Sequence, residues 1–191
     1  MQNPAYQYVL PGSYTVKLVV TSDKGCKDSI NNVIVVDTLP TAFAGADRVI
    51  CENDTTILGK PAVIGESYVW DNLLTLDDNQ IAQPKAFPQT NTTYSVTVTN
   101  TNGCTSVDDV TVTVNLAPDV SAGVDLIICD RDTITIGGSP TSITPNATYK
   151  WDNAQSLDFD TLANPNAFPN TTTTYTVTVT DAIGCLSLIH I

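Results

Sequence analysis

The sequence predicts an all-β protein made of tandem antiparallel β-sandwiches, of which the first and the last are truncated. Three observations support this fold class. A unit rich in turn residues occurs twice in the chain of 191 residues, with part of a third unit before it. Within each unit, apolar and polar residues alternate with the period of two that is typical of strands. The composition of 29 Thr and 18 Asp against two Glu favours strands and turns over helices.

The two full repeats share a series of motifs in the same order. The motifs read A-G, I-C, Y-x-W-D-N, A-F-P, T-T-Y and G-C, and they begin at positions 44, 50, 68, 86, 92 and 103 in one copy and at 122, 128, 149, 167, 173 and 184 in the next. We therefore expect a complete domain over residues 43–115 and a further repeat over 119–185. The linkers 37–40 and 115–118 are short and end in proline, which makes them semi-rigid.

Both ends of the chain carry partial repeats. Residues 1–38 match only the second half of the repeat, because P-G-S-Y-T-V, its tyrosine strand, already stands near their start. The repeat over 119–185 lacks a segment equivalent to the alternating strand at 110–114. We therefore expect its strand over 175–180 to have an unpaired edge. Residues 186–191, L-S-L-I-H-I, look like the translation of a sequencing adapter, and we expect this technical tail to pack without a structural role.

The alternating strands predict which side chains form the core. In the strand over 94–99, one face carries Tyr94, Val96 and Val98, and the other carries the Ser and Thr residues between them. The tryptophans lie inside a strand of the same kind, which favours packing in the core over stacking on a carbohydrate. The predicted core of the two full repeats contains Val110 and Val112 and the aromatic residues Tyr68, Trp70, Tyr94, Tyr149, Trp151 and Tyr175.

The motifs resemble those of known repeat families. P-G-S-Y-T-V, at 11–16, resembles the late-strand signature of PKD domains. The full repeats look like the related Ig-like modules of very large secreted bacterial surface proteins, of the adhesin-like type found in gliding bacteria, which carry Y-x-W, T-T-Y-x-V-x-V-T and G-C. After the tryptophan, D-N stands in place of the F-G-D-G turn of PKD domains, so the full repeats are better described as Ig-like. The resemblance implies tandem Ig-like or PKD-like sandwiches and no single function.

The five cysteines follow the repeat. Each full repeat has two, Cys51 with Cys104 and Cys129 with Cys185, and the partial first repeat has Cys26, which is equivalent to the second of each pair. In an exported protein this pattern favours one disulfide inside each full repeat. Strand geometry opposes it, because a strand about 20 Å long would separate two cysteines whose Cα atoms must lie within about 7 Å. Free or buried thiols are the alternative, and the absence of any C-x-x-C spacing disfavours zinc.

Acidic residues give weaker signals. The loops 77–79 and 158–160, and Asp47 and Asp125 after the linkers, offer oxygen atoms that could bind calcium, although aspartate is equally typical of solvated turns. We expect no other cofactor. The sequence contains no nucleophile motif, no Cys-His pair and no phosphate-binding loop, and Asp71 and Asp152 lie in separate repeats. We therefore expect no catalytic residue and no enzyme activity in this chain.

Charge narrows the function classes further. A net charge of −12 disfavours nucleic acid and anionic membranes as partners, and no apolar run reaches the roughly 20 residues of a membrane span. We expect an extracellular or cell-surface array that acts as a structural or adhesive spacer or stalk. Its expected partners are the neighbouring repeats of the same chain, with surface glycans or other cells as further candidates. The alternative is an accessory, glycan-binding region of a secreted polymer-degrading enzyme whose catalytic domain lies outside this sequence.

Overall fold

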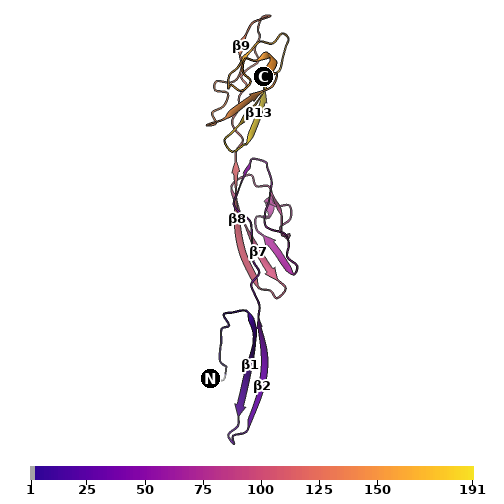
Figure 1. Cartoon of the computed structure of the whole chain (residues 1–191), viewed down its shortest axis with the longest axis vertical. Coiled ribbons are helices and arrows are strands. Elements are labelled where there is room, and N and C mark those ends of the chain that lie inside the picture. The colour runs from indigo at the N-terminus through magenta and orange to yellow at the C-terminus, as the bar shows by residue number, and fades with distance from the viewer. Residues whose placement is uncertain (1–2) are drawn as a thin grey trace. The chain divides into compact units, whose positions relative to one another are not determined.

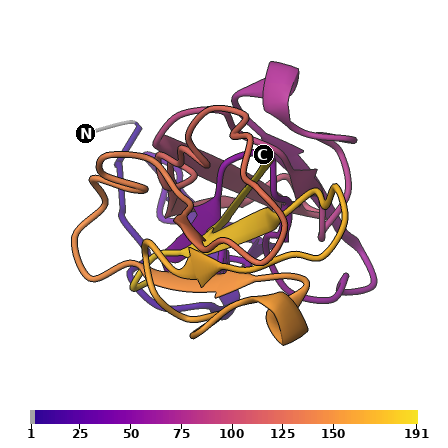
Figure 2. The same ribbon diagram turned by 90° about the horizontal axis from the view of Figure 1, so that it is seen from above.

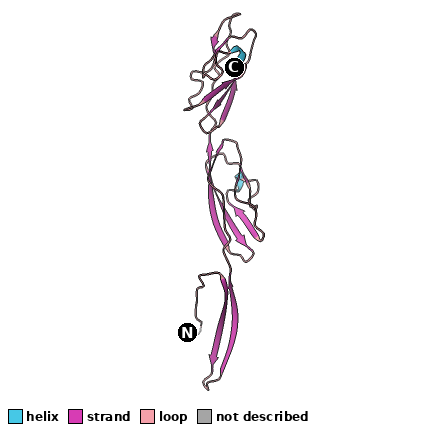
Figure 3. Cartoon of the chain, viewed as in Figure 1, coloured by secondary structure: helices cyan, strands magenta, loops and turns pink. Residues whose placement is uncertain are grey.

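The computed structural model describes residues 3–191. Within that range the chain forms strands, turns and two single-turn 3-10 helices, which confirms the all-β fold class (Figure 3). Two compact units divide it. The first contains the described residues up to Ala46, with Ile57–Ala86 and Thr93–Val110, and the second contains Asp47–Thr56, Phe87–Thr92 and Thr111–Ile191. The boundary passes through the repeat at 43–115, so the compact units and the sequence repeats do not coincide.

In the first compact unit, a long hairpin represents the partial first repeat. β1 (Gly12–Thr21) and β2 (Lys27–Val36) pair antiparallel over their whole length, as the dark strands of Figure 1 show. Leu18 pairs with Ile30, and these side chains are 59% and 60% exposed. The apolar side chains of this hairpin are therefore poorly covered.

The first compact unit also holds most of the second repeat, at 43–115. β5 (Glu66–Trp70) pairs antiparallel with β7 (Thr92–Asn100), and β7 neighbours β8 (Thr105–Asn115). The sheet order is β3 (Arg48–Cys51), β8, β7, β5. A second, small sheet joins β4 (Thr56–Ile57) to β6 (Lys85–Ala86), and the 3-10 helix η1 covers Leu73–Thr75. The alternation places Trp70, Val96 and Val98 inward, each only 1% exposed.

In the second compact unit, the end of the second repeat has a parallel pair of strands. β3 (Arg48–Cys51) runs parallel to the last residues of β8, with Arg48 opposite Val112 and Cys51 opposite Asn115. The main-chain N–H of Glu52 continues this ladder by donating to the carbonyl of Asn115 at 2.8 Å. The start of the repeat is thereby bound to its last residues, next to the linker.

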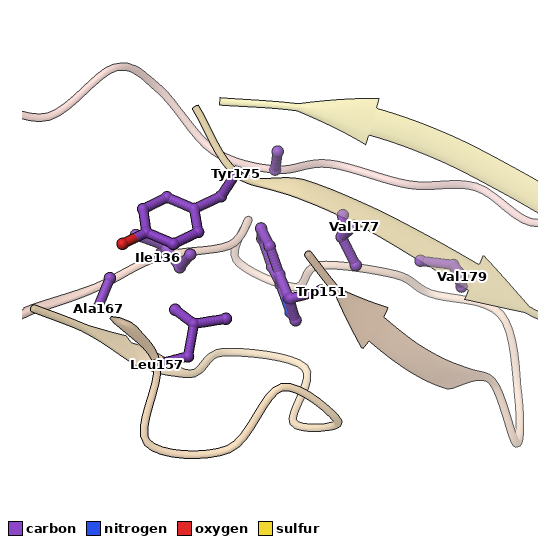
Figure 4. Packing of buried hydrophobic residues seen from close by; sticks show 8 residues of the cluster. Ile136, Trp151, Leu157, Ala167, Tyr175, Val177 and Val179 are labelled. Carbon is purple, nitrogen blue, oxygen red and sulfur yellow. The ribbon is translucent and has the colours of Figure 1, made fainter. Parts of the chain in front are cut away.

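The third repeat, from residue 119, forms the rest of the second compact unit. One sheet has the order β10 (Thr148–Trp151), β12 (Thr176–Thr180), β13 (Leu186–His190), and a small sheet joins β9 (Ile134–Thr135) to β11 (Asn166–Ala167), with η2 at Ala154–Ser156. Figure 4 shows the core, in which Trp151 packs among Leu157, Tyr175 and Val177. This core corresponds residue for residue to that of the second repeat.

The prediction that the strand after Tyr175 would lack a neighbour is wrong. β13 pairs antiparallel with all of β12, and the two strands lie side by side in Figure 1 and Figure 2. Ile191 extends the pairing through two hydrogen bonds with Tyr175. An extended segment supplies main-chain donors and acceptors whatever its side chains are, so the tail at 186–191 can occupy the edge. Its side chains fit less well, since Leu186 and Leu188 remain exposed.

Candidate functional site

The Y-x-W-D-N motif holds each full repeat together. Trp70 and Trp151 each donate the indole N–H to a main-chain carbonyl at 3.0 Å, and both rings are buried. Asp71 and Asp152 each accept a main-chain N–H from the next strand of the sheet, at 2.8 and 2.7 Å. These side chains are committed to structure, and neither tryptophan has a face free for a carbohydrate.

The predicted core aromatic residues lie on the inner faces of their repeats, with one partial exception. Tyr149 is half-buried, whereas Tyr68, Trp70, Tyr94, Trp151 and Tyr175 are buried. The hydroxyls of Tyr94 and Tyr175 each form a 2.8 Å hydrogen bond with a hydroxyl of the 3-10 helix in their own repeat. Desolvation raises the pKa of the Tyr94 hydroxyl above its ordinary value. The Tyr94 hydroxyl therefore stays neutral, and both hydroxyls tie the 3-10 helices to the sheets.

The acidic loops that could have held calcium fold as capped turns. Asp77 accepts two main-chain N–H groups, at 2.7 and 2.8 Å, and Asp158 does the same while also accepting a side-chain amide. Asp160 forms an ion pair with Lys150, and Asp47 accepts a main-chain N–H at 2.9 Å. Among the described residues, no three His, Cys, Asp or Glu side chains gather as a metal site would require.

The junction between the first and second repeats is built on Asp37, which lies in the linker. One carboxylate oxygen accepts the side-chain amides of Asn102 at 2.7 Å, from the turn after β7, and of Asn100 at 3.0 Å, the last residue of β7. The Asn100 side-chain oxygen in turn accepts the main-chain N–H of Cys104 at 2.9 Å. The amide of Asn102, with the N–H of Thr38 and the amide of Asn100, lowers the pKa of Asp37 against the opposing desolvation.

The junction between the second and third repeats has the same contacts with the two residue types exchanged. Asn115 takes the linker position of Asp37, and Asp181 takes the turn position of Asn100. The Asn115 amide donates to one oxygen of Asp181 and lies 3.3 Å from Sγ of Cys185. The other oxygen of Asp181 accepts the N–H of Cys185 at 2.8 Å. Desolvation raises the pKa of Asp181, but the hydrogen bonds to its carboxylate together lower this pKa below its ordinary value.

This second junction is covalent. Cys51 of the second repeat and Cys185 of the third form a disulfide, with their Cα atoms 5.5 Å apart and 134 positions apart in sequence. The cysteines at 26, 104 and 129 are free thiols within the described range. The predicted pairings inside each repeat, Cys51 with Cys104 and Cys129 with Cys185, are therefore wrong.

The direction of β3 is the physical reason for this pairing. Because β3 runs parallel to the end of β8, it carries Cys51 to the end of the repeat where the linker begins, opposite Asn115. Cys104 lies before β8, at the other end of that strand. A strand of this length separates the two cysteines of one repeat and leaves Cys51 beside the turn of the next. Asp and Asn exchange places between the linker and the turn of the two junctions, and this signal in the sequence could have identified the contact. The motifs of the repeats did not reveal it.

Comparisons with known proteins found similar chains but no matching family. No protein-family model matches the chain. The mouse dyslexia-associated protein KIAA0319-like is 28% identical over 202 residues, which cover 90% of this chain and 19% of that protein, so the chain spans about a fifth of that relative. A structure of the N-terminal eight Ig domains of Down syndrome cell adhesion molecule is 12% identical, with a TM-score of 0.53 over 95% of this chain and 31% of that one. The insect immune protein hemolin is 11% identical over 91% of this chain and 54% of its own, with a TM-score of 0.39.

The likeness to the cell adhesion molecule shows an Ig-like fold. It covers nearly the whole chain, which agrees with the sandwich predicted from the alternating strands. Within the described residues, none of the helices has the length and apolar character needed to cross a membrane.

Proposed function

We propose that this chain is a non-catalytic structural segment of an extracellular protein, in which Ig-like repeats act as a spacer or stalk. The observation that carries the proposal is the disulfide between Cys51 and Cys185, which binds one repeat covalently to the next. The bond stabilises the folded repeats, and it also limits how far the linker between them can extend. A chain that bears load or keeps a set spacing requires such a limit.

The location follows from the same bond. Disulfides persist in oxidising compartments, so this junction fits the outside of a cell. A protein named a cell adhesion molecule shares the fold, which agrees with a structural or adhesive role. The finer assignment, to PKD-like and Ig-like arrays of bacterial surface proteins, rests on P-G-S-Y-T-V at 11–16 and on the motifs of the full repeats.

The alternative of a glycan-binding accessory region gains no support from the tryptophans. Sugar rings stack on exposed aromatic faces, whereas Trp70 and Trp151 are each 1% exposed. Binding of an isolated glycan at these positions would require each repeat to open.

Pulling on single molecules of the full chain tests the spacer function. In oxidised protein, the segment between Cys51 and Cys185 should not extend when the repeats unfold. Adding a reductant should release that segment of 134 residues, which at about 3.5 Å per residue is roughly 45 nm of chain. Full extension of oxidised protein without the reductant would contradict the proposal. The variant Cys104→Ser is the matched control, and it should behave as the unchanged chain does, because Cys104 is a free thiol.

A further inference from the structure

We propose that the Cys51–Cys185 bond is one link of a repeating pattern, in which the first cysteine of each repeat bonds to the second cysteine of the repeat that follows it. Under this pattern Cys129 is the bonding site for a further repeat after the third, and Cys104 is the bonding site for a complete repeat before the second. The pattern concerns the bonds between repeats and holds whether the array is a passive spacer or an adhesive one.

The chain has two kinds of cysteine, distinguished by their place in the repeat. We call Cys51 and Cys129 the strand cysteines, because each is the cysteine of the I-C motif at the start of a repeat. We call Cys26, Cys104 and Cys185 the turn cysteines, because each follows the glycine of the late hairpin turn. The structure bonds a strand cysteine to the turn cysteine of the next repeat. Each of the three free thiols is therefore of a kind whose partner belongs to a different repeat.

The strand cysteine is placed by the closing strand of its own repeat. Cys51 lies opposite Asn115 in the parallel ladder, and Asn115 reaches both Asp181 and Cys185 with its side-chain amide. The residue that ends the closing strand thus holds a strand cysteine on one side and a turn cysteine on the other. This arrangement needs only a closing strand, a linker and the next turn, and every junction of a longer array contains all three.

Half of the same site is already formed around Cys104. Its N–H is held by Asn100, and Asn100 and Asn102 bind Asp37 in the preceding linker. Asp37 is the residue equivalent to Asn115, beside which the strand cysteine Cys51 lies. The strand cysteine of a complete first repeat would therefore reach the end of β2 next to Asp37, within reach of Cys104.

The side of the junction that holds the strand cysteine is represented by Cys129, which is exposed. Residues 125–130 line an open groove of about 570 Å³ together with Ile134, Tyr175 and Ile191. In the second repeat the equivalent segment pairs with the last residues of β8, whereas residues 126–129 pair with no strand of the described chain. A closing strand that continued past the position of Ile191 would fill this groove and bring Cys129 to its own linker.

Bond formation at Cys129 requires an oxidant. We assign this role to a disulfide, of the kind supplied by glutathione disulfide or a protein disulfide oxidoreductase. The Cys129 thiolate attacks the oxidant's disulfide and releases one thiol, and the turn cysteine then attacks the mixed disulfide and releases the second. Two protein thiols lose two electrons and two protons in total, and the oxidant becomes two thiols.

An extended chain tests the pattern. Residues 1–185 are followed by a second copy of residues 105–191, which supplies a closing strand, a linker and a further repeat. In the added copy alone, the strand cysteine is removed by Cys129→Ser. The two turn cysteines remain distinguishable by mass, because T-S-V follows the first and L-S-L follows the second. After oxidation in a glutathione buffer, the bonds are mapped on unreduced peptides.

We expect two bonds, Cys51 to Cys185 and Cys129 to the turn cysteine of the added repeat, each in most of the molecules. Cys129 found free, or bonded to Cys185 of its own repeat, would overturn the pattern. A Cys51–Cys185 bond in the same molecules shows that the known junction has folded, so that such a result would leave the proposed spacer function standing. Loss of the Cys51–Cys185 bond itself would overturn both proposals.

Single substitutions in the extended chain provide the controls. Cys129→Ser in the original third repeat should remove the second bond and leave Cys51–Cys185 intact. Cys26→Ser should change neither bond, because the pattern assigns Cys26 a partner in a repeat before the first. A shift of Cys185 to a new partner in either variant would count against the pattern.

Discussion

The second and third repeats share their core residues but differ in how they are closed. In the second repeat, β8 continues far enough to bury Val110 and Val112 and to pair with β3. In the third, β13 and Ile191 cover only the first part of that path, and the groove lined by 125–130 stays open. The comparison teaches that a short edge strand completes the main-chain pairing of β12. Covering the end of the core and placing the strand cysteine both require the second half of the closing strand.

The disulfide provides the largest expected effect in this comparison. Cys51→Ser should lower the free energy of unfolding by about 4–5 kcal/mol, because the bond closes a loop of 134 residues in the unfolded chain. Cys104→Ser removes a free thiol from the turn that is equivalent to the turn of Cys185, and it should change stability by less than about 0.5 kcal/mol. Urea unfolding of oxidised protein measures both variants. Equal losses in the two would mean that Cys51 is bonded to Cys104 of its own repeat and not to Cys185.

Two matched side-chain truncations, one in the closing strand of each repeat, should lower the free energy of unfolding by less than the loss of the disulfide does. Counted from the G-C turn, Ile191 stands where Val110 stands in the second repeat. Val110 is 1% exposed, so Val110→Ala should destabilise the second repeat by about 2 kcal/mol. Ile191 is only half-buried beside the open groove, so Ile191→Ala should cost about 1 kcal/mol or less although it removes more atoms.

Tryptophan fluorescence separates the two measurements. Trp70 reports on the second repeat and Trp151 on the third, so each truncation is followed in a background where the other tryptophan is phenylalanine. A larger loss for Ile191→Ala than for Val110→Ala would show that the third repeat is closed as tightly as the second.

The third repeat lacks a carboxylate that the second repeat has, and adding it to β13 should increase stability by a similar amount. In the second repeat Asp108 accepts the main-chain N–H of Ala44 at 2.8 Å, and the equivalent residue of the third repeat is Ile189, which has no acceptor. Ile189→Asp should therefore stabilise the third repeat by about 1 kcal/mol, through a hydrogen bond to Ala122. Thermal unfolding followed at Trp151 measures the change. Ile189→Asn is the control for charge, and a loss of stability in both variants would refute the equivalence of the two closing strands.

The pH dependence of the two junctions is the smallest effect. Asp37 and Asp181 have lowered pKa values in the folded chain, so their hydrogen bonds contribute stability above the ordinary aspartate pKa of about 4 and lose it as the pH falls further. Amide exchange in the turns that contain Cys104 and Cys185 should therefore accelerate below about pH 4, beyond the intrinsic effect of pH. Loosening should go further at the first junction, which has no disulfide to limit it. In Asp37→Asn the acceleration at the first turn should disappear, and its persistence would mean that another group titrates there.

Much of the fold could be predicted from the sequence because it depends on local patterns. The alternation in T-V-T-V strands determines which face of each strand is buried, and the strand over 94–99 has the predicted register. The tryptophans of the W-D-N motif are predicted to lie in the core, but the hydrogen bonds of Asp71 and Asp152 to the neighbouring strands could not be predicted, because they join residues more than 20 positions apart. The role of 186–191 was also missed, since main-chain pairing does not depend on the origin of a segment.

The sequence by itself determined the repeats, the strand faces, the core aromatic residues and the two kinds of cysteine, all of which are properties of spacing along the chain. Only the tertiary structure decided which cysteines meet. Two cysteines of one repeat are equivalent partners in a pattern, but a strand has a direction. β3 runs parallel to the end of β8, so Cys51 lies at the linker, while Cys104 precedes β8 by that strand's whole length. The bond to Cys185 follows from that direction, which no motif in the sequence records.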